Sequence, residues 1–206
     1  MLHYKKQPYN SVWVRADSQE ELGLTFMRFA EFYESENPLF KNNIFTLGQL
    51  KNWYSENYGT DTYHVDWVGY NIPSRVLNPF KQGLFDPLTT EETKLLDLFR
   101  YRTDSFYIIG AQDNNTLRHE LAHALYAFNP QYKLEIDRFC SKNRLKLKKV
   151  SNYILAKGYH KDVLNDEIQA YITDNDDTEI INNTCPAIIA DMNKIFNKYN
   201  TAKVKK

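Results

Sequence analysis

Two histidines and a glutamate in the middle of the chain combine residue types that bind metals and move protons. His119, Glu120 and His123 stand in the order His-Glu-x-x-His. On an α-helix, side chains four residues apart project from the same face, so both imidazoles can bind one metal ion. Glu120 lies about 100° further round the helix, where a general base can take a proton from a metal-bound water. This spacing predicts a metal site with Glu120 as its base.

The flanking residues predict a helix for this motif, with a strand before it. Phe106 to Gly110 has the pattern of a short buried strand, Asp113 to Thr116 offers several N-cap side chains, and Asn129-Pro130 ends the helix. If that strand is a sheet edge, an extended substrate could pair with it. An apolar stripe lets the helix bury one face while it presents the histidines on another. The stripe consists of Leu117, Leu121, Ala124, Leu125 and Phe128.

The sequence HELAH on a helix, preceded by an apolar strand, resembles the zincin metallopeptidases. The zincins with a third histidine in HExxHxxGxxH are excluded, because Tyr126 replaces their glycine and Asn129 their last histidine. A glutamate on a later helix is the other common third ligand, as in gluzincins similar to thermolysin. The resemblance covers roughly Phe106 to Asp174. It implies a zincin-like fold, one Zn²⁺ per chain, and hydrolysis of a peptide or protein substrate.

Glu167 is the predicted third metal ligand. It lies in the run Asn165-Asp-Glu-Ile-Gln-Ala-Tyr171, which reads as a helix with apolar positions on either side of the glutamate. A carboxylate placed in this way is drawn inward, where its charge is costly unless it is paired or bound to a metal. An exposed helix glutamate is the alternative interpretation. The rival ligands are Asp166, His160, Asp162 and Asp174.

Tyr171 is a candidate for stabilising negative charge during the reaction. It lies one helical turn beyond Glu167 on the same face, so its hydroxyl could donate to the oxyanion of a tetrahedral intermediate. A packing role is the alternative, and Tyr126 and Tyr159 are weaker candidates for the donor. The chain departs here from the thermolysin-like pattern, in which an aspartate at this position orients the first histidine. The partner of the outer nitrogen of His119 is therefore left open.

Composition narrows the class of protein. The chain has 206 residues, enough to bury a core without a metal, so zinc would serve catalysis. The 26 basic and 26 acidic residues balance, which argues against a dedicated nucleic-acid or membrane-surface protein. Two cysteines do not make a disulfide framework, no apolar run is long enough to span a membrane, and the N-terminus lacks a signal peptide. These features predict a cytoplasmic protein. The oligomeric state is left open.

The rest of the pattern predicts an α+β fold, with a small, mostly antiparallel sheet packed on helices and a helical C-terminal part. The whole chain, 1–206, is predicted to form a single zincin-like domain. Residues 1–112 would be its α/β part, and residues 113–200 its active-site helix and helical part. Three capping pairs predict helix starts in the N-terminal part: Ser18 with Glu21 for a helix Gln19–Glu36, Thr46 with Gln49 for a helix that stops near Gly59, and Thr89 with Glu92 for a helix that ends near Arg102. The other predicted elements are a strand Ser11–Ala16, an alternating strand Thr62–Tyr70 and an irregular loop Asn71–Leu88.

A second function remains open because basic residues cluster in one segment. The stretch from Arg138 to Lys161 contains eight basic residues and no acidic one. A solvated helix face is the simpler interpretation. The alternative is a non-catalytic protein with a zincin scaffold that binds an anionic protein or nucleic acid through this segment. The presence of Glu120 favours the enzyme, since metal binding alone does not require it.

Overall fold

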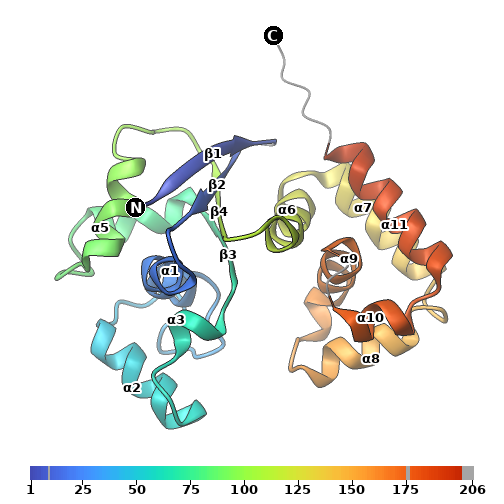
Figure 1. Cartoon of the computed structure of the whole chain (residues 1–206), viewed down its shortest axis with the longest axis horizontal. Helices are drawn as coiled ribbons and strands as arrows, with labels where there is room; N and C mark the ends of the chain where they lie inside the picture. The colour runs from blue at the N-terminus through green and yellow to red at the C-terminus, as the bar shows by residue number, and fades with distance from the viewer. Residues whose placement is uncertain (9, 175–176, 201–206) are drawn as a thin grey trace. The chain divides into compact units, whose positions relative to one another are not determined.

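The structure is a computed structural model that describes residues 1–8, 10–174 and 177–200. Within these ranges the chain has eleven α-helices and one mixed sheet of four strands, which confirms the α+β class. None of these helices is long and apolar enough to cross a membrane. The chain divides into two compact units, one holding Met1–Lys6 and Asn10–Gln112 and the other continuing from Asp113 (Figure 1). That both form a single domain stays a prediction.

The first unit is built on a sheet with the strand order β1-β2-β4-β3. Its strands are β1 (His3–Gln7), β2 (Ser11–Arg15), β3 (Gly69–Pro73) and β4 (Tyr107–Ala111). β4 pairs in parallel with β2 and antiparallel with β3, and all five of its residues are buried. The strand predicted before the metal helix is therefore present, but it is a central strand. The suggestion that it pairs with an extended substrate was wrong, because both of its edges are already occupied.

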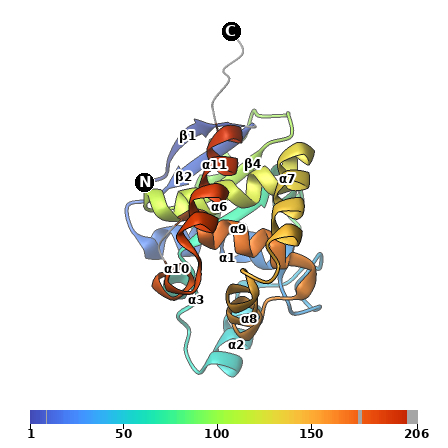
Figure 2. The same cartoon turned by 90° about the vertical axis from the view of Figure 1, so that its right-hand side faces the viewer.

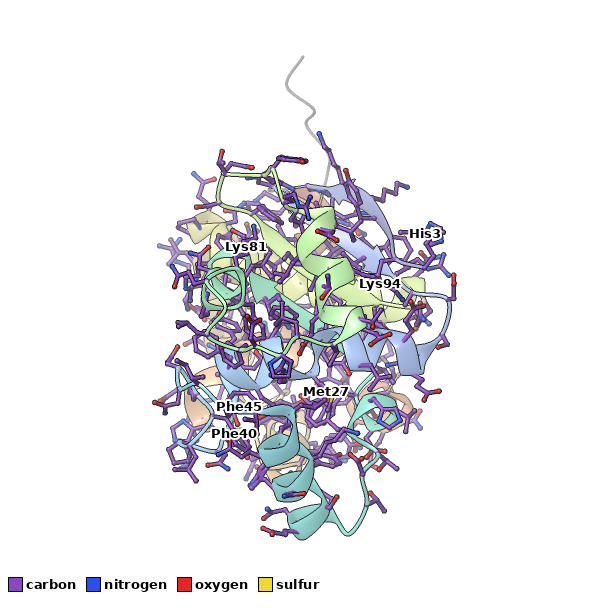
Figure 3. All side chains as sticks on the ribbon, turned by 90° about the vertical axis from the view of Figure 1, so that its left-hand side faces the viewer. His3, Met27, Phe40, Phe45, Lys81 and Lys94 are labelled. Atoms are coloured by element: carbon purple, nitrogen blue, oxygen red, sulfur yellow. The ribbon has the colours of Figure 1, made fainter. Side chains whose placement is uncertain are left out.

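Helices of the first unit cover the sheet and complete its core. They are α1 (Gln19–Glu34), α2 (Leu47–Tyr58), α3 (Tyr63–Asp66), α4 (Leu77–Lys81) and α5 (Thr90–Leu98). α1 lies close against β4, because a Cβ at Gly110 would come within 2.7 Å of the Phe26 ring. Only a residue without a side chain at position 110 lets α1 and the sheet approach so closely. In another part of the core, Phe40 and Phe45 lie together near α2, with their ring centroids 4.6 Å apart (Figure 3).

Side-chain caps begin three of these helices as predicted. Thr46 with Gln49 and Thr89 with Glu92 form complete capping boxes at the starts of α2 and α5. Ser18 accepts a hydrogen bond from the Glu21 backbone N–H at the start of α1. These short-range contacts place the helix starts within a residue of the predicted positions, because capping depends on local sequence alone.

Two predictions for the middle of this unit were wrong. The expected strand Thr62–Tyr70 is instead the short helix α3 followed by β3. Tyr63 is buried and its hydroxyl donates to Glu31 Oε1 at 2.9 Å, whereas Val65 and Trp67 are about half exposed, so the alternation does not mark one buried face. The segment expected to be an irregular loop, Asn71–Leu88, contains the end of β3, a 3₁₀ turn (η1, Ser74–Val76) and α4. Burial of its apolar side chains outweighs the breaking effect of its prolines.

The second unit is helical among its described residues, as predicted. Its helices are α6 (Asn114–Phe128), α7 (Pro130–Lys142), α8 (Lys148–Ala156), α9 (Leu164–Asp174), α10 (Thr178–Asn183) and α11 (Pro186–Tyr199), with a 3₁₀ turn (η2, Lys161–Val163) before α9. α6 and α9 lie side by side, and α7 and α11 pack near them (Figures 1 and 2). Cys140 is buried, Cys185 is exposed, and both are free.

Buried Glu31 makes the stability of the first unit depend on pH. Burial raises the pKa of Glu31, while hydrogen bonds from Ser35 and Tyr63 oppose the shift. The folded chain therefore binds this proton more tightly than the unfolded chain does. The free energy of unfolding then falls as pH rises from the ordinary value of 4.5 through the raised pKa.

We expect Glu31→Gln, which removes the charge, to raise the melting temperature at pH 7 by about 2–4 °C, corresponding to about 1 kcal/mol. The difference should vanish below pH 4.5, where the carboxyl is protonated in both states. Thermal unfolding followed by circular dichroism across pH 4–8 measures the effect, with the exposed Glu56→Gln as control. A gain of equal size at every pH would show that the charge of Glu31 is not its cause.

Candidate metal centre

Capping residues mark both ends of α6. Asp113 Oδ1 accepts hydrogen bonds from the backbone N–H groups of Asn115 and Thr116 at 2.7 and 2.9 Å. At the other end, Asn129 terminates α6 and caps the start of α7. The apolar stripe predicted for this helix is buried at Leu117, Leu121, Ala124 and Leu125, whereas Phe128 is half exposed. The helix therefore has one settled orientation, which determines where its histidines point.

His119 and His123 face each other from consecutive turns of α6. Their Nε2 atoms lie 3.1 Å apart, and their side chains are only 16% and 12% exposed. Glu167 of α9 lies against them, with its Oε2 atom 3.9 Å from His123 Nε2. One ligand atom from each of the three residues lies within 4.8 Å of the others, a group that could hold a metal ion. Ligand atoms of a tetrahedral zinc site are roughly 3.4 Å apart, so small movements would suffice.

The outer nitrogens of both imidazoles are bound by carboxylates of α9. His119 Nδ1 lies 2.5 Å from Asp174 Oδ2, and His123 Nδ1 lies 2.8 Å from Asp166 Oδ1. An ionised carboxylate has no hydrogen to donate and acts only as an acceptor, so each imidazole donates from Nδ1. The other nitrogen of each ring, Nε2, then points inward. Metal-binding histidines almost always have such a partner. The partner of His119, which the sequence left open, is thus Asp174.

Glu167 carries a buried oxygen that lacks a hydrogen-bond donor. The residue is 9% exposed, and among the described residues its Oε2 atom has no hydrogen-bond partner. An ionised carboxylate in such a place is costly unless a cation compensates it. The orphaned oxygen faces the Nε2 atoms of both imidazoles, whose Nδ1 atoms are already engaged by carboxylates. This arrangement fits a metal ion, which would satisfy all three atoms together.

The charges within the cluster shift two of its pKa values. Burial raises the pKa of Glu167, and the charges of Asp166 and Glu120 add to this rise, while both histidines oppose it. Burial lowers the pKa of His123, but the charge and hydrogen bond of Asp166 outweigh it and hold that pKa well above the ordinary value. The site thus holds more negative groups than positive ones, which is the electrostatic environment of a cation site.

Glu120 is buried next to the same cluster. It is 7% exposed, and its charge raises the pKa values of His123, Glu167 and Tyr159. Its carboxylate therefore lies within electrostatic range of all three side chains. The role of Glu120 as a base stays a prediction.

Two tyrosines line the cluster. The Tyr171 ring meets the His119 ring edge-on, with centroids 4.9 Å apart, and its hydroxyl lies 3.2 Å from that of Tyr159. Burial raises the pKa of both tyrosines, and the charge of Glu167 adds to the effect. Tyr159 follows Gly158, whose φ of +99° strongly favours glycine. Both hydroxyls are therefore protonated donors at neutral pH, held as a pair beside the histidines.

Several sequence-based candidates lie elsewhere. The side chain of His160 is 76% exposed and that of Asp162 is 87% exposed, and they contact each other at 3.2 Å. The hydroxyl of Tyr126 donates to Asp137 Oδ1 at 2.6 Å, so it is engaged on the α7 side of α6. Among the described residues, the group that could hold a metal ion therefore consists of His119, His123 and Glu167, and these rivals do not belong to it.

Asp166 and Asp174 are functional candidates whose role the sequence did not reveal. Both were weighed as rival ligands, yet each contacts the outer nitrogen of a histidine. Asp174 follows Glu167 by seven residues, two helical turns, and therefore returns to nearly the same face of α9. From that spacing the sequence could have predicted that Asp174 lies on the same side of α9 as Glu167. Removal of Asp166 would free the His123 ring, so we expect the metal site to depend on this aspartate even though it is not a ligand.

Comparison with known proteins adds no family: no family model, curated protein or solved structure matches the chain. The case for a metal centre therefore depends on the arrangement of its own residues.

We expect Glu167→Ala to weaken the binding of a divalent metal by more than about 100-fold, the upper end of the loss caused by removing an outer partner of a ligand. Titration with a chromophoric competing chelator measures this affinity. His160→Ala, an exposed residue outside the cluster, is the control and should bind like the wild type. Wild-type affinity in Glu167→Ala would exclude this glutamate as a ligand. A loss of metal affinity in His160→Ala would show that the metal binds at His160 instead.

Proposed function

We propose that this protein is a zinc-dependent peptidase of the gluzincin kind. It would hold one zinc ion through His119 Nε2, His123 Nε2 and the carboxylate of Glu167. The observation that carries the proposal is the orphaned Oε2 atom of buried Glu167, which faces two imidazoles that carboxylates orient from behind. Two imidazoles and one carboxylate are a ligand set typical of catalytic zinc. A bound zinc ion supplies Lewis-acid chemistry, by polarising a carbonyl and making water more acidic.

Glu120 is the proposed general base. It stands on the turn between the two histidines, and its buried carboxylate acts electrostatically on His123 and Glu167. In this role it removes a proton from the attacking water as the water oxygen bonds to the scissile carbonyl carbon. It then delivers that proton to the departing amine nitrogen as the carbon–nitrogen bond breaks. The carboxylate ends the cycle in its starting state, and the products are a carboxylic acid and an amine.

Tyr171 is the proposed donor to the carbonyl oxygen as negative charge develops there. Its ring packs edge-on against His119 and its hydroxyl is hydrogen-bonded to that of Tyr159, so one of the two tyrosines can donate to the substrate while the other supports it. A fixed donor in a partly buried site stabilises the transition state more than one exposed to water does. The positive charge of Lys157, 5.0 Å from the centre of the Tyr171 ring, favours this donation.

The test separates chemistry from binding. Glu120→Gln preserves size and removes the base, so zinc content should persist while hydrolysis of a peptide library falls by about 10²-fold or more. Metal analysis gives the zinc content, and mass spectrometry of the digested library gives the activity. Glu179→Gln, a matched change at an exposed glutamate, is the control and should retain activity. Equal turnover by Glu120→Gln and the wild type would show that Glu120 is not the base.

A second candidate function rests on the surface around the turn between α7 and α8. Six exposed basic side chains gather there, and none of them forms an ion pair with a described residue. We call this surface the basic corner: Arg138, Lys142, Arg144, Lys146, Lys148 and Lys149. Leu145, 81% exposed, lies within it. Lys157, counted with this segment in the sequence, is instead paired with Asp177. The surface suits an anionic protein or nucleic acid.

The binding candidate predicts that the basic corner captures an anionic probe without turnover. Labelled polyglutamate and an oligonucleotide serve as probes, read by fluorescence anisotropy at two salt concentrations. Replacing Arg144, Lys146 and Lys148 by Glu should abolish binding, whereas the same change at exposed Lys5, Lys6 and Lys41 should not. Equal effects of both triple variants would show that net charge alone governs binding. Probe binding together with an inert peptide library would favour this candidate over the peptidase.

A further inference from the structure

A chain of buried hydrogen bonds leads from α7 to the metal centre. Tyr132 and Gln169 are both 0% exposed, and the Tyr132 hydroxyl donates to Gln169 Oε1 at 2.6 Å. The Gln169 Nε2 group then donates to Asp166 Oδ1 at 3.0 Å. The same Asp166 oxygen lies 2.8 Å from His123 Nδ1. Three side chains, Tyr132, Gln169 and Asp166, therefore connect the interior of the second unit to a predicted metal ligand. We call them the relay.

Each group in the relay fixes the orientation of the next. The amide of Gln169 has one acceptor and one donor end, and the hydroxyl of Tyr132 holds the acceptor end. A flipped amide would turn its carbonyl oxygen toward the Asp166 carboxylate, which can only accept. The correct orientation instead gives Asp166 a second donor and restrains its rotation. An anchored Asp166 in turn holds His123 Nδ1 in a hydrogen bond and turns Nε2 of the same ring toward the predicted metal position.

We propose that Tyr132 and Gln169 are positioning residues that fix the His123 ring for metal binding through Asp166. This inference builds on the proposed metal site, but its geometry is independent of any catalysis. Polar groups buried this completely are usually hydrogen-bonded, so the pairing of Tyr132 with Gln169 is not by itself a sign of function. What distinguishes the relay is its end point, the outer nitrogen of a ligand, where changes in such partners commonly alter metal affinity by about 10- to 100-fold.

The experiment uses Tyr132→Phe, Gln169→Met and the double variant of the full chain. Zinc affinity is measured with a competing chelator, and the exchange of the His123 Nδ1–H proton with solvent is measured by nuclear magnetic resonance in zinc-free protein. Tyr199→Phe is the matched control, because its hydroxyl also donates to a carboxylate, Glu135 Oε2, and its ring packs on Tyr132 outside the relay. Tyr132→Phe retains the shape of the buried ring, so it remains informative if Gln169→Met is unstable.

We expect Gln169→Met to lower zinc affinity by about tenfold and Tyr132→Phe by a smaller factor. Adding Tyr132→Phe to Gln169→Met should cause no further loss, because the tyrosine acts only through the amide. In both single variants the Nδ1–H proton should exchange faster, and the Tyr199→Phe control should match the wild type in both measurements.

The outcomes separate the relay from the proposed function. Faster Nδ1–H exchange in the variants of a protein that binds no zinc would support the relay and overturn the zinc site. Variants that melt at lower temperature yet retain wild-type zinc affinity and Nδ1–H exchange would overturn the relay, since Tyr132 and Gln169 would then serve stability alone. Additive losses in the double variant would likewise contradict action through a common path.

Discussion

The burial of one carboxylate against two imidazoles is the constraint on which the candidate site depends. His119 and His123 belong to one helix and approach an ion from one side, so a further ligand must come from a second helix. α9 offers a candidate at Glu167, whose Oε2 atom is buried without a hydrogen-bond partner among the described residues. Apolar packing holds that carboxylate in place, because Ile168, Ala170 and Ile172 of α9 are themselves buried. The free-energy cost of the arrangement is offset when a cation binds.

The direction of the two helices explains how one segment serves both histidines. His119, earlier in α6, contacts Asp174 at the end of α9, whereas His123, later in α6, contacts Asp166 near its start. The two helices therefore pass each other in opposite directions. Glu167 lies between the two aspartates in sequence, so α9 provides the candidate ligand and both outer partners. The second unit thus contains the whole candidate site within two packed helices and the tyrosines beside them.

The sequence predicts this part of the molecule well because its signals are local. The caps Asp113 and Asn129, the helical spacing of the histidines and the apolar residues around Glu167 are all encoded within short stretches. The strand expected over Thr62–Tyr70 failed for the opposite reason. Tyr63 is buried by its contact with Glu31, thirty-two residues away, and no local pattern reveals such a partner. The roles of Asp166 and Asp174 were missed for the same reason, since they depend on how α9 crosses α6.

The measurement that tests the central claim most directly is the location of zinc in the protein, by anomalous X-ray diffraction from zinc-soaked crystals. The account predicts one ion per chain, bound by His119 Nε2, His123 Nε2 and a carboxylate oxygen of Glu167 at about 2.0–2.2 Å. An ion bound at another place, or a Glu167 carboxylate more than about 4 Å from an ion held by the histidines, well outside any zinc–ligand distance, would contradict it.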